Sequence, residues 1–255
     1  MRRWPWALLF ATAIAIVAMA QVSLAQTAAA PVAVSTAQAS PVPDAAAADP
    51  VVEWGASIPF VSAYVWRGFV VADAACFQPT ASVAVRGLTI TTWFNVIAGS
   101  DDAGWSEHDL IVDYTLPVGG WTVSAGYTNY YFPTITDGKV SNEFYGGVGW
   151  SGLLSPTVTI YQDVSVGAGT YLSAGVSQSF PVSKSGITIA PAATIGYNHH
   201  QWVAGTGWSD LNVGVTVTLP AGKHVDIAAS FNYSKSLQPD WFPSRGYSGI
   251  TFVVH

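Results

Sequence analysis

The stretch "VVEWGASIPFVSAYVWRG" at residues 51–68 alternates between large apolar side chains and small or polar ones. Trp54 and Ile58 fall on one face, whereas Glu53 and Ser57 fall on the other. A period of two is the signature of a β-strand whose faces meet different environments, because successive side chains point to opposite faces. The stretch therefore predicts an amphipathic strand at the start of the folded region.

The same alternation recurs along the chain, for example in "HDLIVDYTL" at 108–116 and in "SDLNVGVTVTL" at 209–219. It predicts an all-β fold of about twelve antiparallel strands, although ten strands fit the length almost as well. A strand of about ten tilted residues covers the apolar layer of an outer membrane. The expected strands span 51–66, 78–86, 88–97, 107–116, 120–131, 140–150, 155–164, 168–180, 185–198, 208–219, 222–234 and 246–255.

The connections between these strands alternate in length, which is typical of an up-and-down barrel with turns at one end and loops at the other. An even number of strands leaves both termini on the periplasmic side. We expect periplasmic turns at 86–88, 117–120, 151–156, 181–186 and 220–223. We expect outer loops at 67–77, 98–106, 132–139, 165–167, 199–207 and 235–245.

The composition favours a membrane barrel over a soluble one. Half of the residues are hydrophobic (50%) and only 9% are charged, whereas a soluble domain carries about 25% charged residues. Beyond the N-terminus no apolar run reaches the roughly 18 residues that a membrane-spanning helix needs. The net charge of −6 and the lack of a basic stripe argue against a nucleic-acid partner.

The N-terminal 50 residues differ from the rest of the chain. Residues 1–25 have two arginines, an apolar run and a small-x-small ending, which predict a cleavable signal peptide. An uncleaved membrane anchor is the alternative for this segment. Residues 26–50, rich in Ala and Pro, predict a disordered leader, and residues 51–255 are expected to form the barrel. Either way the protein is exported, and we expect it in the bacterial outer membrane.

Aromatic residues cluster near the predicted strand ends, as they do where a barrel meets the two membrane interfaces. Trp54, Trp121 and Trp150 fall near the periplasmic ends. A second girdle is expected near the outer ends from Trp66, Tyr130, Tyr131, Phe132, Trp202 and Trp208.

The predicted lumen face carries more acidic than basic side chains, and an acidic lining favours cations. An equal alternative is that some of these acids pair with the two arginines and only stabilise the barrel. The expected pore-lining residues are Glu53, Arg67, Arg86, Glu107, Asp109, Asp113, Glu143, Tyr145, Tyr161, Asp163, Asp210 and Asp226.

The sequence predicts no enzyme, cofactor or metal centre. It has no GxSxG element, phosphate loop or CxxC pair. His199 and His200 are adjacent, a spacing that does not put two metal ligands on one side, and His108 stands on another strand. Cys76 is the single cysteine, too far from the signal to carry a lipid, and we interpret it as a loop thiol.

Four segments together resemble a family of uncharacterised bacterial outer-membrane β-barrel proteins regarded as porins: "SAYVWRGF", "NEFYGGVGW", "SPTVTIYQDV" and "GTYLSAGVSQSFPV". The firmest points are Tyr-x-Trp-Arg-Gly at 64–68, Glu143 with Tyr145, and Tyr161 with Asp163. The chain departs from the usual aromatic C-terminal residue, since it ends in "GITFVVH". The resemblance implies a barrel and a pore, and supplies no catalytic residue.

The sequence therefore predicts a porin-like channel for passive passage of small solutes, with a lumen that mildly favours cations. Expected partners are outer-membrane lipid, small solutes and the barrel-assembly machinery; no oligomeric state is indicated. Two alternatives remain: a closed structural or adhesive barrel, in which Arg67, Tyr145 and Tyr161 block the lumen, and a lipid-modifying barrel enzyme. The latter would need a Ser or Asp beside His108, His199 or His200.

Overall fold

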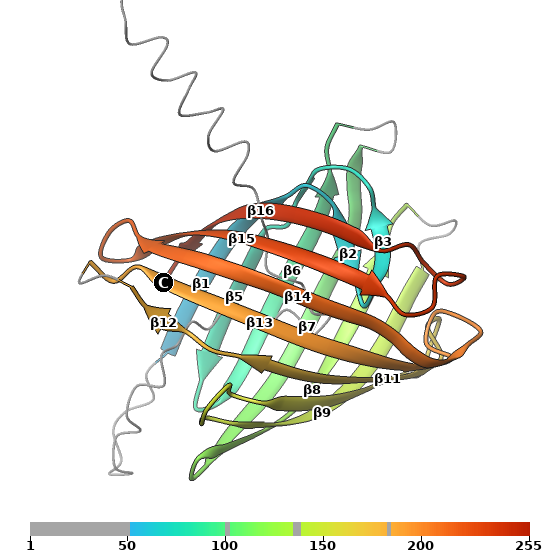
Figure 1. Ribbon diagram of the computed structural model, residues 1–255, viewed down its shortest axis with the longest axis horizontal. Helices are drawn as coiled ribbons and strands as arrows, with labels where there is room; N and C mark the ends of the chain where they lie inside the picture. The colour runs from blue at the N-terminus through green and yellow to red at the C-terminus, as the bar shows by residue number, and fades with distance from the viewer. Residues whose placement is uncertain (1–51, 100–102, 135–138, 183–184) are drawn as a thin grey trace, which may run out of the picture.

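The computed structural model describes residues 52–99, 103–134, 139–182 and 185–255, which form a closed antiparallel β-barrel (Figure 1). The sheet closes on itself because β1 pairs with β16 and β11 pairs with β13. The wall has twelve strands, as predicted. No helix among the described residues is long and apolar enough to cross a membrane. The predicted signal peptide and leader lie outside the described residues.

Apart from the first strand, the strand bounds match the predicted ranges to within about three residues. The short strands β4 and β5 together occupy one position in the wall, between β1 and β6, because both pair with these two strands. The strands are β1 (Val52–Val61), β2 (Tyr64–Trp66), β3 (Phe69–Ala72), β4 (Cys76–Phe77), β5 (Thr80–Val85), β6 (Leu88–Ile97), β7 (Gly104–Val118), β8 (Trp121–Phe132), β9 (Lys139–Trp150), β10 (Thr157–Asp163), β11 (Gly169–Ser177), β12 (Phe180–Pro181), β13 (Thr188–His199), β14 (Thr206–Pro220), β15 (Val225–Ser236) and β16 (Arg245–Val254).

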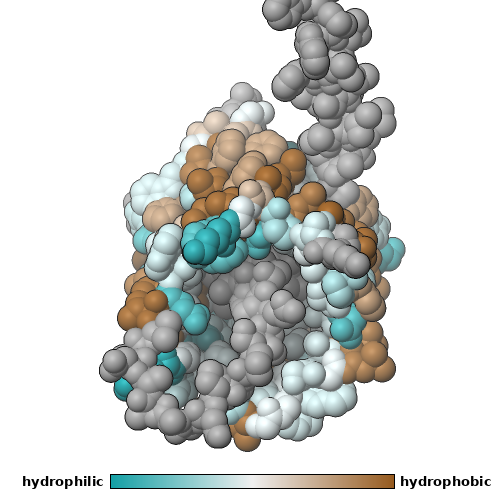
Figure 2. Space-filling model, turned by 90° about the vertical axis from the view of Figure 1, so that its left-hand side faces the viewer, coloured by the Kyte–Doolittle hydropathy of each residue, from teal (hydrophilic) through white to brown (hydrophobic). Residues whose placement is uncertain are grey.

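We call the end where β1 begins and β16 finishes the terminal end, at the left of Figure 1, and the opposite one the loop end. The outer face of the wall is apolar: Trp54, Ile58 and Phe144 are 62%, 55% and 54% exposed. Viewed from the terminal end, hydrophobic residues cover the flanks, while hydrophilic and neutral residues surround the mouth (Figure 2). This reversal of the soluble pattern fits lipid outside and polar groups inside.

The inner face changes along the barrel axis. Toward the terminal end, the side chains that point into the interior are small. Toward the loop end, they include buried acids and tyrosines. Small side chains leave space in a twelve-strand barrel, and large ones fill it. Pairs of small inward residues include Gly55–Ser82, Ser124–Gly147, Thr159–Ser173, Ala192–Gly214 and Ser230–Gly249.

The structure corrects the prediction for the first strand and the loop after it. Strand β1 ends at Val61, and residues 64–72 form a separate hairpin, β2–β3. Residues 67–77 were expected in an exposed outer loop, but Arg67, Gly68, Ala72 and Cys76 are buried. The expectation failed because alternation in sequence marks a strand without saying whether that strand lies in the wall or inside the barrel.

Aromatic residues mark both ends of the outer wall. At the terminal end the rings of Trp121 and Trp150 lie 6.5 Å apart. At the loop end Trp105 contacts Tyr131, with ring centroids 5.9 Å apart, and lies beside His108. The predicted terminal girdle is confirmed, and part of the outer one.

The β5–β6 turn requires a glycine at position 87. Gly87 has φ +84°, and a Cβ there would lie 2.4 Å from the backbone oxygen of Thr115. We expect Gly87→Ala to lower the free energy of unfolding by about 1–3 kcal/mol, because it adds a clash to a left-handed backbone. Urea unfolding in lipid vesicles measures the change.

Gly222→Ala is the matched control, because a Cβ at Gly222 meets nothing within 4 Å. This variant should stay within about 0.5 kcal/mol of the parent protein. Equal losses in the two variants would contradict the explanation.

Candidate functional site

The tip of the β2–β3 hairpin is a two-residue turn formed by Arg67 and Gly68, with φ angles of 47° and 82°. Positive φ at both central residues is the pattern of a type I′ turn, whose twist suits a hairpin. A Cβ at Gly68 would lie 2.4 Å from the ring of Phe242 and 2.9 Å from Cβ of Asp210. The tip is therefore wedged against the wall and a loop-end connection.

The hairpin crosses the lumen. It is connected to β1 and β4, and β10 lies six places around the wall from β1 in either direction. The Arg67 guanidinium nevertheless stacks on Tyr161 of β10, 4.0 Å from the ring centroid, and on Tyr171 of β11, at 4.7 Å. The hairpin thus joins opposite sides of the barrel near its loop end.

A bidentate ion pair holds the tip in place. The two terminal nitrogens of Arg67 donate to the Glu143 carboxylate at 2.6 and 2.9 Å, and one also donates to Gln201 Oε1 at 2.6 Å. The Gln201 amide and the Tyr130 hydroxyl donate to the same carboxylate, at 2.6 and 2.9 Å. All four residues are buried. An ion pair this deep keeps its charges only when such hydrogen bonds replace water.

The other buried acids differ in how they are satisfied. Asp210 accepts from Tyr171, Ser209 and Asn212, and Asp163 accepts from Ser141. Glu107 accepts from the Tyr64 hydroxyl. Asp109, two residues along the same face of β7, has its Oδ1 buried without a hydrogen-bond partner.

The predicted pore-lining residues fall into three groups. Arg67, Glu143 and Tyr161 meet in the network at the hairpin tip, and the remaining buried members are Glu107, Asp109, Asp163 and Asp210. Asp113, Tyr145 and Asp226 are half-buried toward the terminal end, where the Tyr145 hydroxyl donates to Asp113 at 2.9 Å. Glu53 and Arg86 are exposed at the terminal end.

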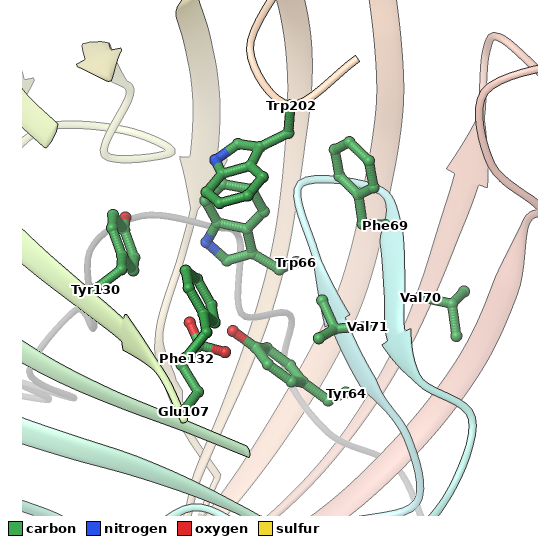
Figure 3. Close-up of a pocket in the computed structure, with 9 residues that line it drawn as sticks. All are labelled: Tyr64, Trp66, Phe69, Val70, Val71, Glu107, Tyr130, Phe132 and Trp202. Atoms are coloured by element: carbon green, nitrogen blue, oxygen red, sulfur yellow. The ribbon is translucent and has the colours of Figure 1, made fainter. Parts of the chain in front are cut away.

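A pocket of about 230 Å³ lies between the hairpin and the wall formed by β7 and β8 (Figure 3). The predicted outer girdle is wrong for four residues, because Trp66, Tyr130, Phe132 and Trp202 line this internal pocket. The alternation in sequence locates aromatic residues near strand ends. It does not show whether they face lipid or a hairpin inside the lumen. Tyr64, Phe69, Val70, Val71 and Glu107 complete the lining.

Gln201, Tyr130 and Tyr171 belong to the network, but the sequence pattern does not predict them there. Gln201 lies in a connection, where no periodicity marks an inward side chain. The two tyrosines could have been found, because each falls on the same face as a predicted acid of its neighbouring strand: Tyr130 pairs with Asp109, and Tyr171 with Tyr161 beside Asp163.

The remaining candidates lie apart from this network. His108 Nε2 contacts Thr92 Oγ1 at 2.9 Å, and His199 Nδ1 contacts Thr206 Oγ1 at 2.8 Å. The rings of His199 and His200 touch, with centroids 4.6 Å apart. Cys76 is not a loop thiol as interpreted from the sequence: it lies in β4, fully buried. Within the described part of the chain no three metal-ligating side chains are grouped.

Because only Arg67 forms a buried ion pair, we expect its replacement to destabilise the protein much more than replacement of Arg86, which lies in a similar Arg-Gly turn. Arg67→Met should lower the free energy of unfolding by about 3–5 kcal/mol, because it leaves the Glu143 carboxylate buried without a partner. Arg86→Met should change it by less than about 0.5 kcal/mol, since Arg86 is exposed at the same kind of turn, with φ 52°.

Urea unfolding of both variants in lipid vesicles provides the comparison. The double variant Arg67→Met/Glu143→Gln should recover part of the loss, because it removes the orphaned charge. If Arg67→Met and Arg86→Met lower the free energy of unfolding by similar amounts, the turn and not the ion pair determines the loss of stability.

Comparison with known proteins gives the fold and the family. The NanC porin has a TM-score of 0.51 at 9% identity, covering 80% of this chain and 100% of that one. OmpF of Salmonella typhi has a TM-score of 0.41 at 6% identity (80% and 97% covered), and the translocator domain of the autotransporter NalP of Neisseria meningitidis 0.39 at 12% (83% and 90%). No curated protein matches the chain.

The likeness to the NanC porin shows that the fold is that of a bacterial outer-membrane barrel, whose apolar wall faces lipid. The expected resemblance to an uncharacterised barrel family is confirmed as well. A family model described as "Bacterial protein of unknown function (Gcw_chp)" matches residues 44–236. The chain therefore belongs to the Gcw_chp family of bacterial proteins.

Proposed function

We propose that the protein is a porin-like channel for the passive passage of small solutes across the outer membrane. The observation that carries this proposal is the lining of the terminal half, where small residues face one another across neighbouring strands, as in Gly55–Ser82 and Ala192–Gly214. Small side chains leave room along the axis, and hydrophilic and neutral residues surround the end that faces the viewer in Figure 2. A barrel that served only as a scaffold would have no need of this space.

The hairpin sets the size of the solutes. It crosses the loop half of the lumen and is tied to the opposite wall through Arg67 and Glu143. Passage must then follow the space that remains beside β2 and β3. We infer a narrow channel, suited to solutes smaller than those of barrels with 16 to 18 strands.

The charges of the interior favour cations. Among the described residues the buried charged side chains are one base, Arg67, and five acids: Glu107, Asp109, Glu143, Asp163 and Asp210. Asp113 and Asp226 add acids to the half-buried lining of the terminal half. Acidic rings raise the local concentration of cations and disfavour anions.

The proposed topology puts the terminal end in the periplasm, as the short turns at that end suggest. The exported chain would reach the membrane with its signal peptide removed and its leader preceding β1. The barrel-assembly machinery would then insert it, and small solutes would be its only soluble partners.

A bilayer recording tests the channel. The purified protein should give small, stable conductance steps, and replacing residues 64–72 with a short Gly-Ser link should raise the step size severalfold, because it removes the hairpin from the lumen. A truncation of the exposed 221–223 turn is the control and should leave the step size unchanged. No conductance from the parent protein would overturn the channel.

A closed barrel is the second candidate, favoured by one observation: the hairpin spans the full width of the lumen and all its tip contacts are buried. The same recordings separate the two. Conductance that appears only after replacement of the hairpin would identify a plugged barrel with a structural or adhesive role.

Ion selectivity tests the acidic lining. In a potassium chloride gradient the parent channel should show a cation preference, and Asp113→Asn/Asp226→Asn should reduce it about twofold or more, because two lumen charges are lost. Asp240→Asn, which removes an exposed acid from a loop-end connection, is the matched control. A reversal potential that stays the same in the double variant would contradict the proposed role of these acids.

A further inference from the structure

We propose that the pocket beside the hairpin binds an organic cation, an ammonium group carried on an apolar or aromatic body. This site would not depend on conduction, because it needs only the barrel and the docked hairpin. The pocket is smaller than the roughly 300–1,000 Å³ of sites for drug-sized ligands, at about 230 Å³. Its ligand should therefore be a small amine.

The walls of the pocket are aromatic on both sides. Tyr64, Trp66 and Phe69 come from the hairpin and face the β8 residues Tyr130 and Phe132, with Trp202 at the loop end (Figure 3). Aromatic faces attract cations within about 6 Å of the ring centroid, and Trp attracts them most. Several rings around one space thus form a cage that suits an ammonium group better than an anion.

A carboxylate supplies the charge. Glu107 is the one acidic residue in the lining, and its carboxylate lies beside the Tyr64 hydroxyl (Figure 3). It is only 3% exposed, so water screens it little. A buried carboxylate is stable only when a cation or hydrogen-bond donors compensate it.

The Arg67 guanidinium stacks on the pocket residue Trp66, 4.5 Å from the ring centroid, but its charge is balanced by another acid. Arg67, the buried base of the described residues, is held by Glu143 at 2.6 Å. Asp109, 4% exposed, lies next to Glu107 on the same face, and its Oδ1 has no hydrogen-bond partner. A ligand cation beside these two neighbouring acids would stabilise their ionised form, which burial alone disfavours.

The lining of the pocket is partly exposed. Val71 on its rim is 46% exposed, and Trp66, Phe69, Phe132 and Trp202 are half-buried. The charged group lies deeper than the apolar rim. A ligand would therefore enter with its ammonium group toward Glu107 and leave its apolar body against the rim.

Calorimetric titration of the full-length protein in detergent tests the site with three probes that share a phenylethyl body: 2-phenylethylammonium, neutral 2-phenylethanol and anionic 3-phenylpropanoate. The ammonium should bind at least about tenfold more tightly than the alcohol, as expected for a charged hydrogen bond, and the anion should not bind. Equal binding of ammonium and alcohol would overturn the proposal and indicate an apolar pocket only.

Two variants and one control locate the binding. Glu107→Gln should remove the preference for the ammonium, while Asp240→Asn, an exposed acid at the same end, should preserve it. Should Glu107→Gln fail to form the barrel, Phe132→Leu gives the second test and should weaken the ammonium about two- to fivefold through the lost aromatic face. If the folded Glu107→Gln and Phe132→Leu variants bind the ammonium as the parent protein does, the ligand binds outside this pocket and the proposal is overturned.

Discussion

Backbone hydrogen bonding in a medium without water is the constraint on which this structure depends. A sheet that crosses hydrocarbon cannot leave an edge, since each unpaired N–H or C=O costs several kcal/mol there. The pairing of β1 with β16 removes the last edge, and Ile58 faces Phe252 across that junction. Closure in turn creates an enclosed interior, and every special feature of the protein follows from what fills it.

The interior is filled unequally, and the ion pair of Arg67 with Glu143 explains why. Small residues line the terminal half, so that half depends on the wall alone. In the loop half the hairpin brings one arginine across the barrel to a carboxylate, an amide and two tyrosine rings. The same docking creates the aromatic pocket, because its hairpin side is Tyr64, Trp66 and Phe69. One contact thus organises both the narrowest part of the lumen and the proposed binding site.

The wall could be predicted from the sequence because its physics is local. Alternation between lipid and interior is recorded at every second residue, so eleven of the twelve strands were predicted to within about three residues at each end. The hairpin could not be located in this way, since its pattern resembles that of a wall strand. Only "WRG" at 66–68 indicates a turn, because the same Arg-Gly pair at 86–87 lies in a predicted turn. The pocket depends on tertiary packing, and its aromatic residues looked like a membrane girdle.

The partners of the hairpin tip come from widely separated parts of the chain: Glu143 stands 76 residues and Gln201 134 residues beyond Arg67. Tyr171 lies between them, on the strand that meets β13. The arginine therefore finds its full set of partners only when both halves of the wall are together. A docked tip is thus a mark of the closed barrel, because its full set of partners does not exist while the wall is open.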